Sequence, residues 1–276
     1  MKPTAGLFLI LCMILSGSPL LAQEAYTLKE DLAYYPAENQ AADDYLKERC
    51  RLDFYYPEKA KGFATVIWFH GGGLKQGSKS IPKELKEQGI AVASVNYRLS
   101  PKAKVTDCIE DAAAATAWVL QNVAEHGGSA DSVFISGHSA GGYLALMVGL
   151  DDKYLKRWEL SPDRLAGLIP FSGHTITHFT ARAEKGIPGH QPVIDGLAPL
   201  FHVKKEAPPI LLITGDRELE MLGRYEENAY FARMMKVAGH DSTRLLELDG
   251  YGHNMAKPAY PLLLKEVRRI EAKKEE

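Results

Sequence analysis

The chain has 276 residues, of which 46% are hydrophobic, and this is enough to build one domain with a large buried core. Its 33 basic and 35 acidic side chains nearly cancel, which leaves a formal net charge of −2. A balance so close to zero does not indicate a protein that binds nucleic acid or an anionic membrane surface.

The first 22 residues have the layout of a secretory signal peptide. Lys2 supplies a positive end, residues 7–15 form a short apolar run, and residues 16–22 are mostly small or turn-forming. This run is well short of the roughly 20 apolar residues that a membrane-spanning helix needs. We expect cleavage after Ala22, export to the periplasm or the cell exterior, no integral membrane segment after cleavage, and a single mature domain over residues 23–276.

Two cysteines would remain in the mature chain, Cys50 and Cys108. An exported protein can join such a pair in a disulfide, but two thiols in a domain of this size can also stay free and buried. We favour two free thiols, and the sequence leaves the pairing open.

Short apolar runs alternate with helix-like stretches along the rest of the chain, after a lead-in over residues 23–50 that is expected to hold one short helix. The runs Val66–Phe69 and Ile210–Ile213 are unbroken, as expected for strands that helices cover on both faces. The pattern predicts an α/β fold with a mostly parallel central sheet flanked by helices. The predicted strands cover residues 51–56, 64–70, 90–96, 132–136, 166–171, 209–214 and 244–248, and the predicted helices cover residues 107–125, 140–149, 224–237 and 261–274.

The first motif with chemical meaning ends the strand at 64–70, where His70 is followed by three glycines. Glycines let backbone amides approach a ligand closely, and such amides can stabilise the negative charge that acyl transfer places on a carbonyl oxygen. We therefore assign oxyanion donors to the amides of Gly72 and Gly73. His70 is expected to hold this loop through hydrogen bonds rather than to take part in the reaction.

A second motif joins the strand at 132–136 to the helix at 140–149. The pentapeptide from Gly137 to Gly141 has the form Gly-x-Ser-x-Gly, with Ser139 at its centre. Between a strand and a helix this form is typical of a nucleophile elbow, a tight turn that holds a strained serine above the sheet. The helix that follows points its first amides at the reaction site, so Ala140 is a third expected oxyanion donor. The alternative is a glycine-rich turn whose serine only caps a helix.

Residues 173–208 are rich in His, Gly and Pro and fit no regular helix or strand. A loop this long in a compact domain is usually either functional or disordered. We expect the segment to run over the sheet and to supply substrate contacts, with His174, Phe179 and Phe201 as candidates. Each of these side chains could equally serve only the packing of the loop.

The remaining motifs follow the last two predicted strands. The strand at 209–214 runs into a loop that carries Asp216 and Glu218, and the loop after the last strand carries His253. The order serine, acid, histidine is that of hydrolases with a nucleophile elbow, and it makes His253 the expected base. The acid stays open: we favour Glu218, which stands three residues after the small Gly215, over Asp216, which is the commoner residue type.

Together these motifs resemble the α/β-hydrolase superfamily, and within it the esterases with a His-Gly-Gly-Gly oxyanion loop. That branch includes the hormone-sensitive-lipase-like esterases and the Bacteroides-type feruloyl and acetyl carbohydrate esterases. The resemblance runs from Cys50 to the C-terminus and includes the stretches Asp53–Pro57 and Asn96–Pro101. The lead-in at 23–50 is short for a helical cap, which favours a carbohydrate esterase with little or no cap over the active site. Glu218 stands where such relatives usually have Asp.

The resemblance implies a serine hydrolase that cleaves carboxylic esters through an acyl-enzyme. His253 would take the proton of Ser139, a carboxylate would keep the imidazole in the required tautomer, and the loop amides would bind the oxyanion. Expected substrates are small-molecule or polysaccharide-borne esters, with acetyl and feruloyl as the favoured acyl groups. No metal, organic cofactor or nucleic-acid partner is expected. The alternatives are a general short-chain carboxylesterase, an arylformamidase and an inactive hydrolase-fold binding module.

Overall fold

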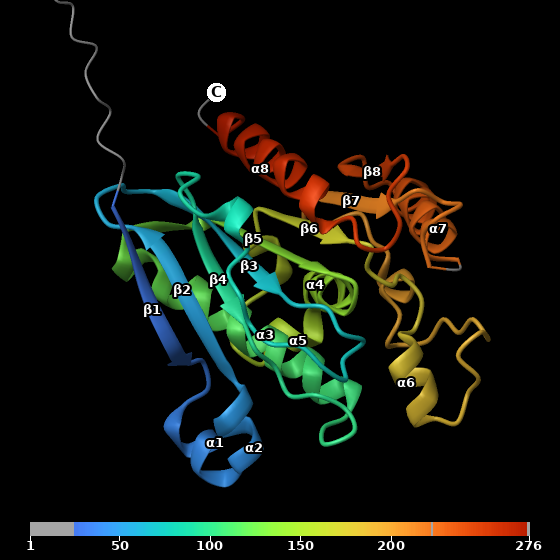
Figure 1. Cartoon of the computed structure of the whole chain (residues 1–276), viewed down its shortest axis with the longest axis horizontal. Helices are drawn as coiled ribbons and strands as arrows, with labels where there is room; N and C mark the ends of the chain where they lie inside the picture. Colours follow the sequence, from blue (N-terminus) through green and yellow to red (C-terminus); the bar gives the residue numbers. More distant parts are fainter. Residues whose placement is uncertain (1–24, 222, 275–276) are drawn as a thin grey trace, which may run out of the picture.

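The computed structural model describes residues 25–221 and 223–274, in which eight strands form one sheet in the order β1-β2-β4-β3-β5-β6-β7-β8 (Figure 1). The pairs β1·β2 and β2·β4 are antiparallel, and every other neighbouring pair is parallel. This confirms the predicted α/β fold with a mostly parallel sheet. The strands are β1 (Tyr26–Ala33), β2 (Arg51–Pro57), β3 (Phe63–Phe69), β4 (Ala91–Val95), β5 (Gly128–His138), β6 (Gly167–Phe171), β7 (Ile210–Gly215) and β8 (Thr243–Leu248).

The predicted helices are present, and the last of them begins well before its expected start. The helix expected from Pro261 begins at Ala256, so the proline lies inside it. Pro258 lies in the first turn, where N–H groups have no intrahelical partner, whereas Pro261 is the sixth helical residue and leaves the Lys257 carbonyl without its helical donor. The helices are α1 (Ala37–Ala42), α2 (Asp44–Arg49), α3 (Val105–Asn122), α4 (Ala140–Leu150), α5 (Asp152–Lys156), α6 (Phe179–Glu184), α7 (Arg224–Val237) and α8 (Ala256–Ala272).

The core forms two layers, one on each face of the sheet. Along β3, Val66 and Trp68 pack in a cluster with α8, whereas Ile67 and Phe69 pack in a cluster with α3 and α4. This alternation is the period of two that a strand covered on both faces must show. Every residue of α4 is buried, so packing on all sides fixes the position of this helix and of the residue before it.

The N-terminal part of the described chain corrects the expected lead-in with one short helix. Residues 26–33 form β1, which pairs with β2 at the edge of the sheet, and two short helices follow. The middle of β1 is exposed and charged, with Lys29, Glu30 and Asp31 in sequence. Charged side chains are common on edge strands because they discourage pairing with another molecule, and here they hide the alternation that would have indicated a strand.

Residues 173–208, which were expected to run over the sheet without regular structure, contain one short helix, α6, and a single 3₁₀ turn at Pro199–His202. In Figure 1, α6 lies below α7, at the far end of the molecule from β1.

Cys50 and Cys108 are free and buried, as favoured from the sequence. None of the helices in the described ranges is long and apolar enough to cross a bilayer. The expected signal peptide lies outside the described residues.

Candidate active site

Ser139 occupies the turn between β5 and α4 in a strained backbone conformation, with φ +56° and ψ −113°. Positive φ is uncommon for a residue other than glycine and persists only where the surroundings enforce it. A Cβ atom on Gly137 or Gly141 would lie 2.6 Å or 2.0 Å from the carbonyl oxygen of Phe69, so both positions must be glycine. Ser139 N donates to the Phe171 carbonyl at 2.8 Å, which ties the turn to β6. The predicted elbow geometry is therefore present.

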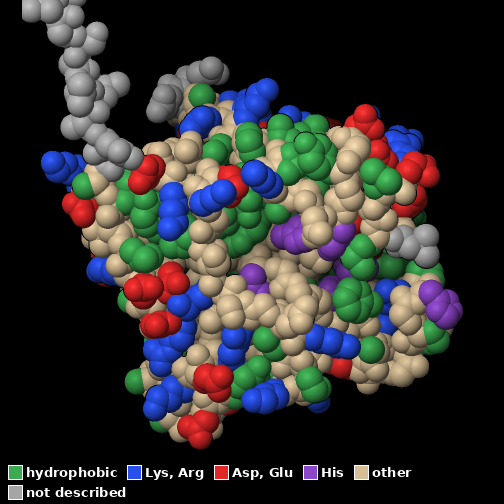
Figure 2. Space-filling view, in the orientation of Figure 1, with side chains coloured by type: hydrophobic (Ala, Val, Ile, Leu, Met, Phe, Trp, Pro, Cys, Tyr) green, Lys and Arg blue, Asp and Glu red, His purple; other side chains and the backbone are tan. Residues whose placement is uncertain are grey.

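His253 lies in the loop after β8, and its Nδ1 is 2.6 Å from Oε1 of Glu220. His253 and Ser139 line the same open cavity of about 630 Å³, together with Gly72 and Gly73. In the described part of the chain, Nε2 of His253 has no hydrogen-bond partner. Since Nδ1 faces the carboxylate, Nε2 is the nitrogen left to exchange a proton at the cavity. Figure 2 shows histidine side chains gathered near the middle of this face, close to where β3 and β6 end in Figure 1.

The carboxylate beside His253 corrects the prediction, because it belongs to neither Glu218 nor Asp216. Asp216 instead accepts hydrogen bonds at 2.9 Å from the N–H groups of Glu218 and Gly250 and so fixes the loop, while the Glu218 side chain is exposed. After Gly215 the chain makes a helical turn, with Glu220 N donating to the Asp216 carbonyl at 2.8 Å. This turn places residue 220, rather than residue 218, beside His253.

Glu220 is held as an anion by several donors. Its Oε1 also accepts the Met221 N–H at 2.8 Å, and its Oε2 accepts the Gly215 N–H at 3.2 Å and the Ser172 hydroxyl. Burial disfavours the charged form, but the hydrogen bonds from His253, Ser172 and Met221 outweigh burial and lower the pKa of Glu220 to about 2. An ionised carboxylate only accepts hydrogen bonds, so the Nδ1 of His253 must carry its proton.

The glycine loop after β3 presents unpaired amides to the same cavity. Gly72 and Gly73 have φ values of +107° and +64°, and a Cβ on Gly72 would lie 2.1 Å from the Gln76 carbonyl oxygen. The Gly72 carbonyl accepts the amides of Lys75 and Gln76 at 3.1 and 3.2 Å, which closes the turn. Among the described residues, the N–H groups of Gly72 and Gly73 have no acceptor. Ala140 begins α4 directly after the serine, where helical N–H groups lack intrahelical partners.

His70 holds this loop, as the sequence predicts. Its Nδ1 is 2.7 Å from the Gly71 carbonyl oxygen, and its ring stacks on Tyr97 with centroids 4.4 Å apart. Burial lowers the pKa of His70 to about 4. The ring is therefore neutral at pH 7, and Nδ1 donates to the carbonyl.

His138 is a positioning residue that sequence reasoning missed. Its Nε2 is 2.8 Å from the carbonyl oxygen of His253, and the two rings lie 4.8 Å apart. Burial, followed by the nearby His253, lowers the pKa of His138 to about 4, so the neutral ring donates to that carbonyl. The only sequence signal was its place beside Ser139, because no spacing rule connects residues 138 and 253.

Two of the three candidate substrate contacts, Phe179 and His174, line a cavity, and the third, Phe201, does not. Phe179 lines the Ser139 cavity and also a second cavity beside it, and His174 lines the second cavity alone. Phe201 is 61% exposed and lines neither. Across the described residues, no three His, Cys, Asp or Glu side chains are grouped in a way that could hold a metal ion.

Comparison with known proteins identifies esterases as relatives. Residues 52–164 match the BD-FAE family model. The esterase LipC of Mycobacterium tuberculosis is 28% identical over 204 residues, which cover 67% of this chain and 50% of LipC. A probable isoprenylcysteine alpha-carbonyl methylesterase of Arabidopsis thaliana is 33% identical over 102 residues, which cover 35% of this chain and 21% of that protein. The chain thus spans half or less of the length of these curated relatives.

Solved structures share the fold over most of the chain. A truncated form of a carbohydrate esterase from gut microbiota aligns with a TM-score of 0.73 at 19% identity, covering 93% of this chain and 100% of that one. A hyperthermophilic esterase from Pyrobaculum calidifontis aligns with a TM-score of 0.64 at 21% identity, covering 80% of this chain and 81% of that one. At these identities the likeness establishes the fold. Together with the sequence relatives, it supports the expected resemblance to α/β-hydrolase esterases of the hormone-sensitive-lipase and BD-FAE type.

Proposed function

We propose that the protein is a serine hydrolase of carboxylic esters, with Ser139 as nucleophile, His253 as general base and Glu220 as the residue that orients the base. The observation that carries this proposal is the 2.6 Å contact between His253 and the shielded Glu220, at a cavity that also contains the strained Ser139. The esterases among the relatives support the same reaction class.

The reaction proceeds in two steps. Nε2 of His253 takes the hydroxyl proton as Oγ of Ser139 forms a bond to the ester carbonyl carbon, and the carbonyl electron pair moves onto the oxygen. The amides of Gly72, Gly73 and Ala140 stabilise this oxyanion, each by about 2.7–4 kcal/mol if it resembles known donors. Collapse expels the alcohol, which receives the proton from His253. Water then attacks the acyl-enzyme by the same route and regenerates the serine.

The finer proposal is an exported carbohydrate esterase that removes acetyl or feruloyl groups. Its support is the match to the BD-FAE family model and the structural likeness to a carbohydrate esterase from gut microbiota. The apolar run at residues 7–15, which lies outside the described residues, is the support for export. A general short-chain carboxylesterase is the alternative, favoured by the esterase relatives of Mycobacterium tuberculosis.

The test of the reaction class uses the purified mature chain and p-nitrophenyl acetate and butyrate. We expect hydrolysis that falls by about 10⁴-fold or more in Ser139→Ala, while Ser129→Ala, at the opposite end of β5 from the elbow, keeps the activity. A folded wild-type protein that hydrolyses none of a broad panel of esters would contradict the proposal and favour a binding module.

The test of the substrate compares acetylated xylan and methyl ferulate with p-nitrophenyl butyrate. A carbohydrate esterase should release acetate or ferulate with a kcat/KM at least equal to that for the butyrate ester. Hydrolysis of the butyrate ester alone would favour the short-chain carboxylesterase.

A further inference from the structure

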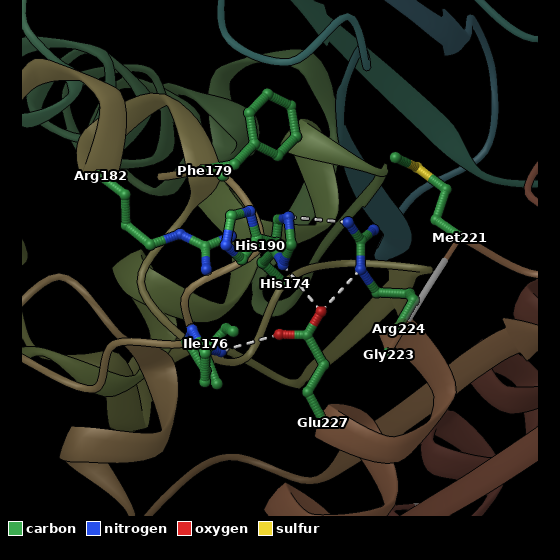
Figure 3. A pocket seen from close by; sticks show the side chains of 11 residues that line it. His174, Ile176, Phe179, Arg182, His190, Met221, Gly223, Arg224 and Glu227 are labelled. Atoms are coloured by element: carbon green, nitrogen blue, oxygen red, sulfur yellow. Dashed lines mark hydrogen bonds and ion pairs between the residues drawn. The ribbon is translucent and has the colours of Figure 1, made fainter. Parts of the chain in front are cut away.

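A second cavity of about 670 Å³ adjoins the cavity of Ser139 (Figure 3). The two cavities share Phe179 and Met221 in their linings, so a ligand bound at the serine can extend into the second cavity. Two guanidinium groups, those of Arg182 and Arg224, belong to its lining. Figure 3 shows their side chains entering the cavity from opposite sides. The only carboxylate among the described lining residues is that of Glu227.

Both carboxylate oxygens of Glu227 already accept hydrogen bonds, from Arg224 and from neighbouring groups. Oε1 of Glu227 accepts Nε of Arg224 at 2.8 Å and faces Nδ1 of His174 at 2.7 Å. Its Oε2 accepts the backbone amides of Thr175 and Ile176 at 3.1 and 3.0 Å. Glu227 therefore neutralises one of the two guanidinium groups, and its oxygens have little capacity left for the other.

His174 does not supply a counter-charge either. Its Nδ1 donates to Glu227, and its Nε2 lies 2.8 Å from a guanidinium nitrogen of Arg224, so this nitrogen can only accept. Burial, followed by the charge of Arg224, lowers the pKa of His174 and keeps the ring neutral. Arg224 also donates to the Ser172 carbonyl. Since a guanidinium has five N–H groups, two of those on Arg224 have no partner among the described residues.

Arg182 is a buried cation without a carboxylate partner. The residue is 4% exposed, and its guanidinium donates to the backbone carbonyl of Gln191. Its Nε has no hydrogen-bond partner, and no carboxylate of the described residues lies within ion-pair distance. Burying an unpaired charge is costly, so an arrangement of this kind is expected where a ligand supplies the missing anion.

We propose that the second cavity binds a carboxylate carried by the ester substrate, with Arg182 as its counter-charge and the two remaining N–H groups of Arg224 as further donors. This inference rests on the proposed esterase function. A guanidinium presents a planar fork of donors that matches a carboxylate. Ile176, Phe179 and Pro192 supply apolar walls for the carbon skeleton that joins the carboxylate to the ester.

The test uses two pairs of esters matched in size. The p-nitrophenyl monoester of glutaric acid against p-nitrophenyl pentanoate places the carboxylate on the acyl side. The 4-acetoxybenzoate anion against its methyl ester places it on the alcohol side. For at least one pair, we expect Arg182→Gln to lower the kcat/KM ratio of carboxylate ester to neutral ester by about tenfold or more, mainly through KM.

Two further variants separate charge recognition from general effects. Arg182→Lys keeps the charge without the fork and should restore part of the ratio. Lys185→Gln removes a cation that is 49% exposed, just after α6, and should leave the ratio unchanged because exposed ion pairs contribute little. An unchanged ratio for both ester pairs in folded Arg182→Gln would overturn the inference.

An inhibition experiment on the wild-type protein covers the case in which Arg182→Gln does not fold. Glutarate or benzoate should inhibit hydrolysis of p-nitrophenyl butyrate with a Ki about tenfold or more below that of the corresponding amide. Equal inhibition by acid and amide would overturn the inference while leaving the esterase proposal intact. Absence of any hydrolysis of neutral esters would instead contradict the esterase proposal.

Discussion

Two histidine–glutamate pairs lie in the same region of the molecule and differ at the second ring nitrogen of the histidine. Nδ1 of His253 is 2.6 Å from Glu220, and Nδ1 of His174 is 2.7 Å from Glu227. The Nε2 of His174 is occupied by Arg224, whereas that of His253 has no partner among the described residues. A histidine beside a carboxylate can therefore act as a base only where its second nitrogen is free. The first pair fits catalysis, and the second holds a cation in the core.

The two pairs are joined through Ser172, which follows β6. Its hydroxyl donates to Glu220, and its carbonyl accepts from Arg224. Ser172 N donates to the Ile213 carbonyl at 2.8 Å, which fixes the residue against β7. A displacement of Ser172 would therefore alter the hydrogen bonds of both Glu220 and Arg224.

The largest expected effect is a loss of activity when the His253–Glu220 pair is broken. His253→Ala should lower kcat/KM for p-nitrophenyl butyrate by about 10⁴-fold, since no other base is available to the serine. His126→Ala, at the opposite end of β5 from the elbow, is the matched control and should retain the activity of the wild type. Less than a tenfold loss in His253→Ala would show that another group accepts the proton.

The second effect separates the pairs by stability. Glu227→Gln should lower the free energy of unfolding by about 3–5 kcal/mol, because it leaves the cation of Arg224 buried and uncompensated. Urea unfolding followed by tryptophan fluorescence measures the loss. Glu226→Gln, on the exposed side of the same helical turn, should change stability by less than about 1 kcal/mol. Equal stability of the two variants would contradict a structural role for the Glu227 cluster.

The third effect tests the link between the pairs. Ser172→Ala removes the hydroxyl donor of Glu220 and keeps the carbonyl that accepts from Arg224. We expect the free energy of unfolding to fall by about 1.5–3 kcal/mol, the usual contribution of a hydrogen bond to a charged group. Glu220 should stay ionised at pH 7, so kcat should fall by no more than about tenfold. A loss of activity as large as that of His253→Ala would assign Ser172 to the chemistry itself.

The fourth effect is a pH dependence of stability. Glu220 has a pKa of about 2 in the folded protein against a reference value of 4.5. Its ionised form therefore stabilises the fold fully above pH 4.5, and this contribution is lost as the pH falls toward 2. The stability difference between the wild type and Glu220→Gln, measured by urea unfolding, should shrink over this range. A difference that is constant or grows on acidification would contradict the ionised state of Glu220.

The parts of the site that the sequence predicts are those defined by local chain geometry. The elbow of Ser139, the glycine loop and His253 each follow a strand directly, so a short motif and its neighbours identify them. Several of the seven predicted strands are unbroken apolar runs, which indicate strands covered on both faces. The edge strand β1 was missed because its exposed middle is charged.

The remaining parts depend on how loops fold in three dimensions. Glu220 reaches His253 only because a helical turn carries the chain from Asp216 to Glu220, and spacing alone favoured residue 218. The spacing of four residues between Asp216 and Glu220 is that of one helical turn, and it is the one feature of the sequence that agrees with this geometry. The pairing of His174 with Arg224 and Glu227 joins segments about 50 residues apart, for which the sequence contains no signal.

The assignment of Glu220 as the carboxylate that orients His253 is tested by the kcat/KM values of Glu220→Gln, Glu218→Gln and Asp216→Asn for p-nitrophenyl butyrate. We expect Glu220→Gln to lose about 10²–10⁴-fold, because the imidazole of His253 would no longer be held in the productive tautomer. The other two variants should stay within about tenfold of the wild type. A greater loss in Glu218→Gln or Asp216→Asn than in Glu220→Gln would show that Glu220 is not the partner of His253 in catalysis.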